Sequence, residues 1–207
     1  MSIVLFHHPH SRAAGTVWQL EEVGVPYQLS FVDIRAGAQK SAEIRAMNPM
    51  GKLPILRDGD VVVTESAAIG LYLADRYAPG RLAPALDHPD RGRYLRWSCF
   101  APAVMEPAVT AHQAGWTVDT SSVGWGEHAA MLDAAEHALE GREYVLGDRF
   151  SMADVIFGGT LGYLMRFGLI EKRPTFAAYT ERLAARPAHR RADERNAAIV
   201  AERGLAG

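Results

Sequence analysis

The chain has 207 residues, of which 48% are hydrophobic, and this composition is typical of a globular protein with a substantial core. Lysine and arginine number 22 and aspartate and glutamate 24, so the net charge of −2 excludes a strong field that would recruit nucleic acid or an anionic membrane. The single cysteine, Cys99, excludes an internal disulfide and fits a reducing compartment. No apolar run reaches the roughly 18 residues of a membrane-spanning helix and no signal-peptide pattern opens the sequence, so we expect a cytoplasmic protein.

The first 78 residues alternate between strand and helix patterns. Strands are predicted at residues 3–6, 27–32, 53–56 and 61–63. Helices are predicted at residues 13–23, 41–47 and 65–77. The crossover rule makes the first two strands parallel, and the turn signal Asp58-Gly59 makes the last two antiparallel neighbours. This βαβαββα order predicts an α/β thioredoxin-like domain.

A breaker-rich linker at residues 79–85 divides the chain, and strand signals vanish after it. Apolar residues at helical spacing predict helices around residues 94–104, 132–139 and 176–183. Pro102 and Pro107 are expected to kink or end the first of these. We therefore expect a first domain over residues 1–78 and an all-helical second domain over residues 86–207.

Residues 151–154 have the spacing of a helix capping box, with Asp154 in place of the usual glutamate. The helix that follows, over residues 155–167, is apolar almost all round, which predicts burial at the centre of the second domain. Gly158 and Gly162 are expected to let a neighbouring helix approach closely. We assign this motif a structural role and no chemistry.

Residues 47–66 contain the strongest functional signal. Pro54 lacks an N–H and is tolerated at strand starts, sheet edges or tight turns, so we expect Leu53 to leave its main-chain groups unpaired within its own sheet. An extended peptide can pair with them as an added strand would. Ser66 lies near a helix N-terminus, which attracts a carboxylate, and Glu65 can pair with an ammonium group. The pattern predicts a site for a small zwitterionic peptide; the alternative is a hairpin followed by an ordinary helix cap.

On these residues the chain resembles the cytosolic glutathione S-transferases of the bacterial type. The likeness runs from residues 3–6 through residues 48–54 and 65–66 to residues 150–155, nearly the whole length. The resemblance implies that glutathione is the co-substrate, that no metal is needed and that the protein is a homodimer. It also implies that small hydrophobic electrophiles are conjugated, as in detoxification, with peroxidase and dehalogenase activities left open.

The resemblance also assigns roles to residues of the glutathione site. It implies that Pro54 is cis and that Leu53 bonds the cysteinyl main chain of glutathione. It implies that Glu65 and Ser66 hold the γ-glutamyl end. The positions that face the glycyl carboxylate are matched by Lys52 and Lys40.

Thiol activation is expected between the first strand and the first helix, at residues 7–12. A thiol of pKa about 8.5 is only a few per cent ionised at neutral pH, and a hydroxyl donor, a guanidinium and a helix N-terminus each stabilise the anion. Ser11 and Arg12 can supply the first two of these. No tyrosine lies nearby and Cys99 is distant, so the chain looks serine-like rather than cysteine-like. We favour Ser11, with His10 as the alternative and a plain helix cap as the other reading of Ser11.

The three histidines of this loop also suggest a metal site. Pro9 should make the side chains of His8 and His10 diverge, and no carboxylate or cysteine stands beside them. We therefore expect no metal.

The electrophile pocket is expected to use residues of the second domain. The candidates are Trp97, Phe100, Val104, Met105, Trp116 and Tyr163. Aromatic residues at helical spacing more often form a core than a pocket wall. Arginines between residues 182 and 195 alternate with acidic residues, which predicts a solvated helical face rather than a nucleic-acid site.

Two classes of function remain. The first is an enzyme that conjugates or reduces small electrophiles with glutathione, and the absence of a nearby cysteine argues against mixed-disulfide chemistry. The second is a non-catalytic binding or protein-interaction module with the same fold. We prefer the enzyme because Lys52, Glu65 and Ser66 together favour retained ligand binding.

Overall fold

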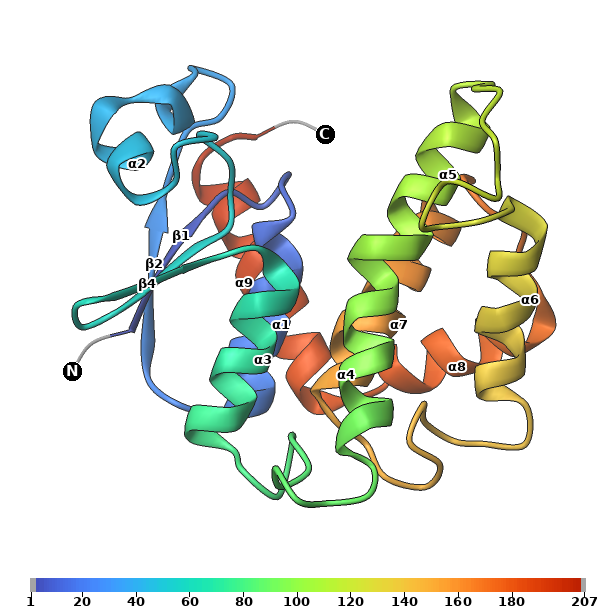
Figure 1. Ribbon diagram of the computed structural model, residues 1–207. Coiled ribbons are helices and arrows are strands. Elements are labelled where there is room, and N and C mark those ends of the chain that lie inside the picture. The colour runs from blue at the N-terminus through green and yellow to red at the C-terminus, as the bar shows by residue number, and fades with distance from the viewer. Residues whose placement is uncertain (1–2, 206–207) are drawn as a thin grey trace. The chain divides into compact units, whose positions relative to one another are not determined.

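The computed structural model describes residues 3–205. The chain divides into two compact units (Figure 1). The first unit joins Met1–Tyr77 to Arg186–Gly207, and the second, here called the helical unit, is Ala78–Ala185. The expected domains were residues 1–78 and 86–207, so the structure differs in assigning the last helix to the first unit.

The first unit contains a four-stranded sheet in the order β2-β1-β3-β4. The strands are β1 (Ile3–His7), β2 (Tyr27–Phe31), β3 (Ile55–Asp58) and β4 (Val61–Thr64). β1 runs parallel to β2 and antiparallel to β3, and β3 runs antiparallel to β4. The helices are α1 (Ala13–Val23), a short α2 (Ala42–Met47), α3 (Ser66–Tyr77) and α9 (Pro187–Glu202). The predicted α/β thioredoxin-like order is confirmed for residues 3–77, with a 3-10 turn (Ala38–Lys40) before α2.

The C-terminal helix α9 packs against α1, from the opposite end of the sequence (Figure 1). Arg186 binds both carboxylate oxygens of Glu22 at 2.7 and 2.8 Å. Arg191 and Arg195 bind Glu21 at 2.8 and 2.7 Å. The side chains of Glu21 and Glu22 are almost fully buried, and a buried carboxylate needs such partners. The predicted solvated face therefore holds three arginines that attach α9 to α1.

The helical unit is built from α4 (Arg91–Phe100), α5 (Glu106–Gln113), α6 (His128–Leu139), α7 (Met152–Arg166) and α8 (Pro174–Ala184). The expected irregularity at Pro102 is present as a π-helical turn, Ala101–Met105, between α4 and α5. α7 packs against α4 and α8, and its buried face includes Phe157. A Cβ added to Gly158 would lie 2.1 Å from Leu183 Cδ1, whereas one added to Gly162 would meet nothing closer than 3.7 Å. An approach that requires glycine is therefore confirmed at Gly158, whereas at Gly162 α8 lies at ordinary contact distance through Thr180.

The predicted capping box is present at the start of α7. Asp154 is fully buried and accepts four hydrogen bonds, from the N–H groups of Ser151 and Val145 and from the hydroxyls of Ser151 and Tyr179. These bonds connect α7 to α8 and to the segment before α7. The carboxylate is therefore an organising centre of the helical unit.

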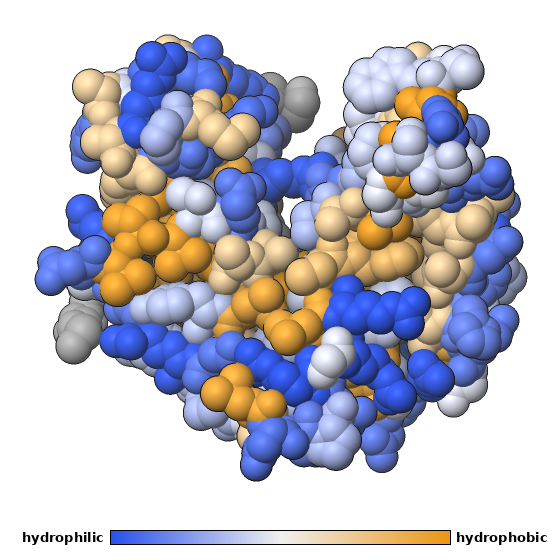
Figure 2. All heavy atoms as spheres, viewed as in Figure 1, coloured by the Kyte–Doolittle hydropathy of each residue, from blue (hydrophilic) through white to orange (hydrophobic). Residues whose placement is uncertain are grey.

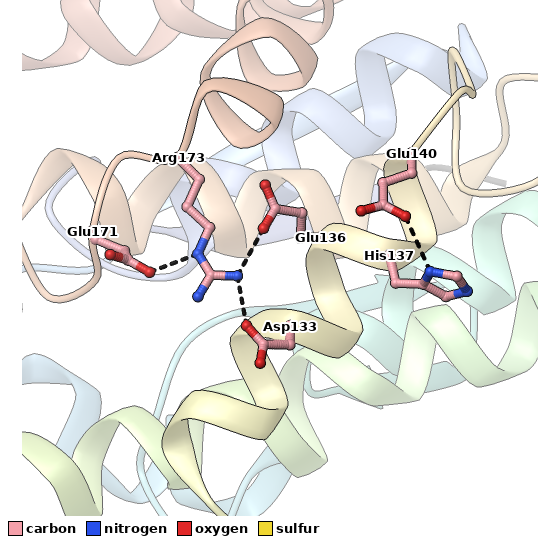
Figure 3. A network of polar contacts seen from close by, with 6 residues as sticks. All are labelled: Asp133, Glu136, His137, Glu140, Glu171 and Arg173. Atoms are coloured by element: carbon pink, nitrogen blue, oxygen red, sulfur yellow. Dashed lines mark hydrogen bonds and ion pairs between the residues drawn. The ribbon is translucent and has the colours of Figure 1, made fainter.

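Arg173, just before α8, holds a second polar network in the helical unit (Figure 3). Its guanidinium binds Asp133 and Glu136 of α6 at 2.8 Å each and Glu171 at 2.6 Å. The network thus fixes the start of α8 to α6. Within residues 3–205 no helix is long and apolar enough to cross a membrane.

Candidate active site

The strand register brings the three predicted site segments to one end of the sheet. Ile55 pairs with Thr64 in the last pair of the β3–β4 hairpin, so Pro54 and Glu65 lie side by side just beyond it. Phe6 of β1 also pairs with Ile55, so β1 leads at the same end into the loop of residues 8–12. The geometry therefore gathers the segments around Leu53, Glu65 and Ser11 within the first unit.

Leu53 enters the sheet through a cis peptide bond to Pro54, as the resemblance implied. Its half-buried side chain packs on the core cluster of Val4, Phe6, Val32, Ile44 and Ile55. Among residues 3–205, no protein group pairs with its main-chain N–H or C=O. These two groups are therefore available to an extended ligand strand.

Buried Asn48 organises the loop before Leu53. Its side-chain amide donates to the Lys52 carbonyl at 3.0 Å, and its side-chain oxygen accepts from the Met50 N–H at 3.2 Å. Gly51 closes the turn with φ +59°, and a Cβ there would lie 2.7 Å from the Gln39 carbonyl oxygen. The loop is thus fixed in one shape that leaves the Lys52 side chain exposed.

Lys40 reaches the same loop from the 3-10 turn. Its Nζ donates to the Met50 carbonyl at 2.9 Å, and the side chain remains exposed. The two predicted lysines therefore lie on one loop and its neighbour, where an ammonium group with spare donors can bind a carboxylate.

Glu65 and Ser66 form the entrance to α3. Glu65 has φ 66°, the only positive φ at a non-glycine residue within the described chain. Its carboxylate and the Ser66 hydroxyl have no hydrogen-bond partner among residues 3–205, and Glu65 is exposed. Buried Gln19 of α1 donates to the Ser66 carbonyl at 2.9 Å. The N-terminus of α3, which Gln19 holds in place, thus presents the Ser66 hydroxyl beside the Glu65 carboxylate, and the Glu65 main chain is in the left-handed region.

The loop from β1 to α1 contains the predicted thiol-activating residues. The Ser11 hydroxyl donates to the His8 carbonyl at 2.8 Å and accepts from the Ala13 N–H at 3.2 Å. The hydroxyl therefore already bonds within the turn before α1, whose N-cap residue is Arg12, and its proton is directed at a carbonyl. His10 and Arg12 are exposed at the same turn, and Arg12 directly precedes α1.

The histidines of this loop are used by the fold. Buried His7 contacts Asn196 of α9, with 2.8 Å between Nε2 and Oδ1, and burial lowers the pKa of His7. Buried His8 accepts the His10 N–H at Nδ1. Among the residues that the structure describes, no group of three or more histidine, cysteine or acidic side chains could hold a metal ion.

The six residues expected in an electrophile pocket all lie in the helical unit and differ in exposure. Trp97 and Met105 are buried, and Trp97 packs edge-on against Phe157 and Phe100. Val104 and Phe100 are half-buried. Trp116 is 61% exposed and Tyr163 is 37% exposed. Burial favours a core role for Trp97 and Met105 and leaves the other four accessible to a ligand.

One hollow of about 490 Å³ lies elsewhere in the helical unit, between α5, α6 and the segment before α8. It is lined by the stacked imidazoles of His112 and His128, by Leu132 and by Arg173, the centre of the network in Figure 3. None of the predicted site residues lines it.

Three supporting residues were not anticipated from the sequence. Gln19 holds Ser66, Asn48 holds the Lys52 loop and His8 holds the turn at Ser11. Gln19 is a polar residue on the buried face of α1, and that conflict with helical patterning is the one signal that could have indicated it.

The fold defines an α/β thioredoxin-like domain joined to a helical unit, and the candidate site lies in the first of these. A family model described as the N-terminal domain of glutathione S-transferase matches residues 1–75, and one described as its C-terminal domain matches residues 98–187. The chain belongs to the glutathione S-transferase family.

Similar proteins agree with this assignment. Glutathione S-transferase F10 of Arabidopsis thaliana is 30% identical over 186 residues, covering 82% of this chain and 86% of the relative. A glutathione transferase from Methylococcus capsulatus superposes with a TM-score of 0.77 at 28% identity, covering 95% of this chain and all of that one. A theta class glutathione S-transferase from Xanthomonas axonopodis, solved with glutathione bound, has a TM-score of 0.71 at 30% identity, covering 92% and 96%.

Proposed function

We propose that the protein is a glutathione transferase that adds the sulfur of glutathione to small hydrophobic electrophiles. The observation that carries the proposal is the grouping, at one end of the sheet, of the unpaired Leu53 main chain with the Glu65–Ser66 entrance to α3. An extended tripeptide with an ammonium group and two carboxylates complements such a site. Family membership and a relative solved with glutathione bound support the same ligand.

Each part of glutathione has a proposed partner. The cysteinyl main chain pairs with Leu53 as an added strand. The γ-glutamyl end uses Glu65 for its ammonium group, and Ser66 with the N-terminus of α3 for its carboxylate. The glycyl carboxylate uses Lys52 and Lys40. Glutathione is thus held extended as co-substrate, with no metal required.

Ser11 is the proposed thiol-activating residue, with Arg12 adding positive charge and His10 as the alternative donor. To donate to a thiolate, the Ser11 hydroxyl must rotate away from the His8 carbonyl that it now contacts. Such a bond favours the anion and lowers the pKa of the thiol, and the thiolate then attacks the electrophile and displaces its leaving group. Ser11→Ala should raise the apparent pKa of the thiol of bound glutathione, measured by thiolate absorbance. An unchanged thiol pKa would assign thiol activation to His10 or to main-chain donors.

The electrophile is proposed to contact the accessible residues of the helical unit, namely Phe100, Val104, Trp116 and Tyr163. Aromatic and aliphatic side chains suit an apolar substrate. A panel of an aryl halide, an organic hydroperoxide and a β-hydroxyethyl mixed disulfide separates conjugation, peroxidase and thiol-exchange activities. We expect turnover of the aryl halide. If glutathione binds but none of the three substrates is turned over, a non-catalytic binding module is favoured.

A homodimer is also proposed, and exposed apolar residues of the first unit support it. β4 is an edge strand, with Val61 44% exposed and Val62 40% exposed, and Met50 is 66% exposed. In the space-filling view, apolar side chains gather over this side of the first unit (Figure 2). An apolar edge strand is a surface that a second chain can cover. Light scattering should give twice the chain mass, and a monomer at all concentrations would contradict the proposal.

Calorimetric titration with glutathione tests the site itself. Glu65→Gln should weaken binding by about 10- to 100-fold, because it removes the charge from one charge-assisted contact. Glu43→Gln is the matched control, since Glu43 is an exposed glutamate of α2 in the same unit and should leave the affinity unchanged. Absence of heat with the unmodified protein would overturn the proposed function.

A further inference from the structure

His8 is a buried imidazole at the centre of the loop that carries Ser11. None of its surface is exposed, and its ring packs against Phe31 with 5.3 Å between ring centroids. Its Nδ1 accepts the His10 N–H at 3.0 Å. Its carbonyl accepts both the N–H of Ser11 at 3.1 Å and the Ser11 hydroxyl at 2.8 Å. Three hydrogen bonds of one turn therefore end on this residue.

The bond from the His10 N–H determines the protonation state of the ring. Because Nδ1 accepts a hydrogen bond, it carries no proton, and a neutral ring has its proton on Nε2. A second proton would have to go to Nδ1 and would face the His10 N–H at 3.0 Å. Only neutral His8 is compatible with the observed turn.

We propose that His8 is a positioning residue for thiol activation, holding the turn of residues 8–11 so that the Ser11 hydroxyl and α1 face the glutathione sulfur. The inference rests on the proposed function. His8 itself contacts no substrate in this role. It acts through the main chain of His10 and through Ser11, whose hydroxyl has a ready alternative acceptor in the His8 carbonyl when no thiolate is bound.

The charges around His8 support a neutral ring. His10 and Arg35 disfavour a positive charge on the His8 ring, whereas Asp33 favours it, and Arg203 lies over the Phe31 ring on which His8 packs. Burial is the largest influence and lowers the pKa of His8. The ring should therefore be neutral at neutral pH and lose its acceptor role in acid.

Two substitutions separate positioning from simple packing. His8→Asn retains an acceptor close to the position of Nδ1 and cannot take up a proton there. His8→Leu fills similar space but removes the acceptor. We expect kcat with the aryl halide to fall about tenfold in the leucine variant, with KM for glutathione changed less, and to stay within about threefold in the asparagine variant. An equal fall in kcat in both variants, or no fall in His8→Leu, would overturn the inference.

The pH profile provides a readout that a merely structural residue would not change. The apparent pKa of the bound glutathione thiol, read from thiolate absorbance across pH, should rise in His8→Leu and stay near that of the unmodified protein in His8→Asn. A raised thiol pKa in His8→Asn contradicts the proposal even if His8→Leu fails to fold. Ile156→Ala, a cavity variant in α7 of the helical unit, controls for lost stability and should retain the normal profile.

Amide hydrogen exchange separates this inference from the proposed function. The His10 amide should be protected in the unmodified protein and in His8→Asn, and unprotected in His8→Leu, whether or not glutathione is present. If the unmodified protein binds no glutathione, the proposed function fails while exchange still tests the turn. If His10 exchanges equally in all three proteins, His8 does not hold the turn.

Discussion

The N-termini of α3 and α7 begin with the same chemistry, a serine and a carboxylate, and use it in opposite ways. At α7 the carboxylate of Asp154 is fully buried and accepts four hydrogen bonds from its own protein. At α3 the carboxylate of Glu65 is exposed and has no partner within residues 3–205. One helix start is complete and the other has unused donors and acceptors.

The difference shows how a structural cap and a ligand site can be distinguished. A buried polar group must be satisfied internally, so the surroundings of Asp154 converge on it from Val145, Ser151 and Tyr179. An exposed group can remain unpaired in water at little cost, and its charge is then available to a ligand. The left-handed φ of 66° at Glu65 adds a conformational cost, and within residues 3–205 the Glu65 carboxylate makes no hydrogen bond that would offset it.

The largest expected effect is on the complete helix start. Asp154→Ala should lower the free energy of unfolding by about 3–5 kcal/mol, because it removes four hydrogen bonds and leaves buried donors at Val145, Ser151 and Tyr179 unsatisfied. Urea unfolding measures the change. Asp148→Ala, at an exposed aspartate shortly before α7, is the control and should change stability by less than about 0.5 kcal/mol. A loss below about 1 kcal/mol for Asp154→Ala would mean that the cluster is not the organising centre described above.

The second effect is a pH dependence of stability that Asp154 should show and the exposed Glu65 should not. Burial raises the pKa of Asp154 to about 6 from the usual 3.8, although its hydrogen bonds oppose the shift. The folded state therefore binds the proton more tightly, so stability from this group is fully present below about pH 4 and is lost as the pH rises through 6. Two pKa units correspond to about 3 kcal/mol.

Comparison with Asp154→Asn isolates that titration. The stability difference between the two proteins should be largest near pH 4 and should shrink as the pH rises to 7. For Asp58 and Glu21, burial is outweighed by hydrogen bonds and nearby arginines, so their pKa values are lowered and their contribution is lost in acid, with the opposite sign. Both groups are present in both proteins and cancel in the difference. A constant difference across this range would contradict the raised pKa.

Much of the fold could be predicted from the sequence because local patterns and tertiary packing agree. The strand alternation, the Asp58-Gly59 turn and the Ser151–Asp154 spacing each specify a local structure that the fold retains. The attachment of α9 could not be predicted in this way. Its arginines alternate with acidic residues like a solvated face, and only the three-dimensional position of Glu21 and Glu22 makes them partners across the chain.

The site could be predicted in part for the same reason. Pro54 and Glu65 mark their positions through backbone chemistry, and the register then brings them together. Residues that support the site carry no such mark: Gln19 and Asn48 act through hydrogen bonds to distant or irregular main chain. Ser11 remains a prediction, and the sequence could not reveal that its hydroxyl already donates to the His8 carbonyl.

The smallest expected effect is on stability at the N-terminus of α3, where a substitution of Glu65 can stabilise the fold and weaken glutathione binding. Glycine adopts a positive φ without the steric cost that other residues incur, so Glu65→Gly should be about 1 kcal/mol more stable than Glu65→Ala and at least as stable as the unmodified protein. Both variants lack the carboxylate and should lose glutathione affinity equally, as calorimetry and urea unfolding can establish together. If Glu65→Ala were the more stable variant, the left-handed conformation would impose no cost at residue 65. If Glu65→Gly gained stability and still bound glutathione normally, Glu65 would have no role in binding the ligand. The N-termini of α3 and α7 would then differ in burial alone.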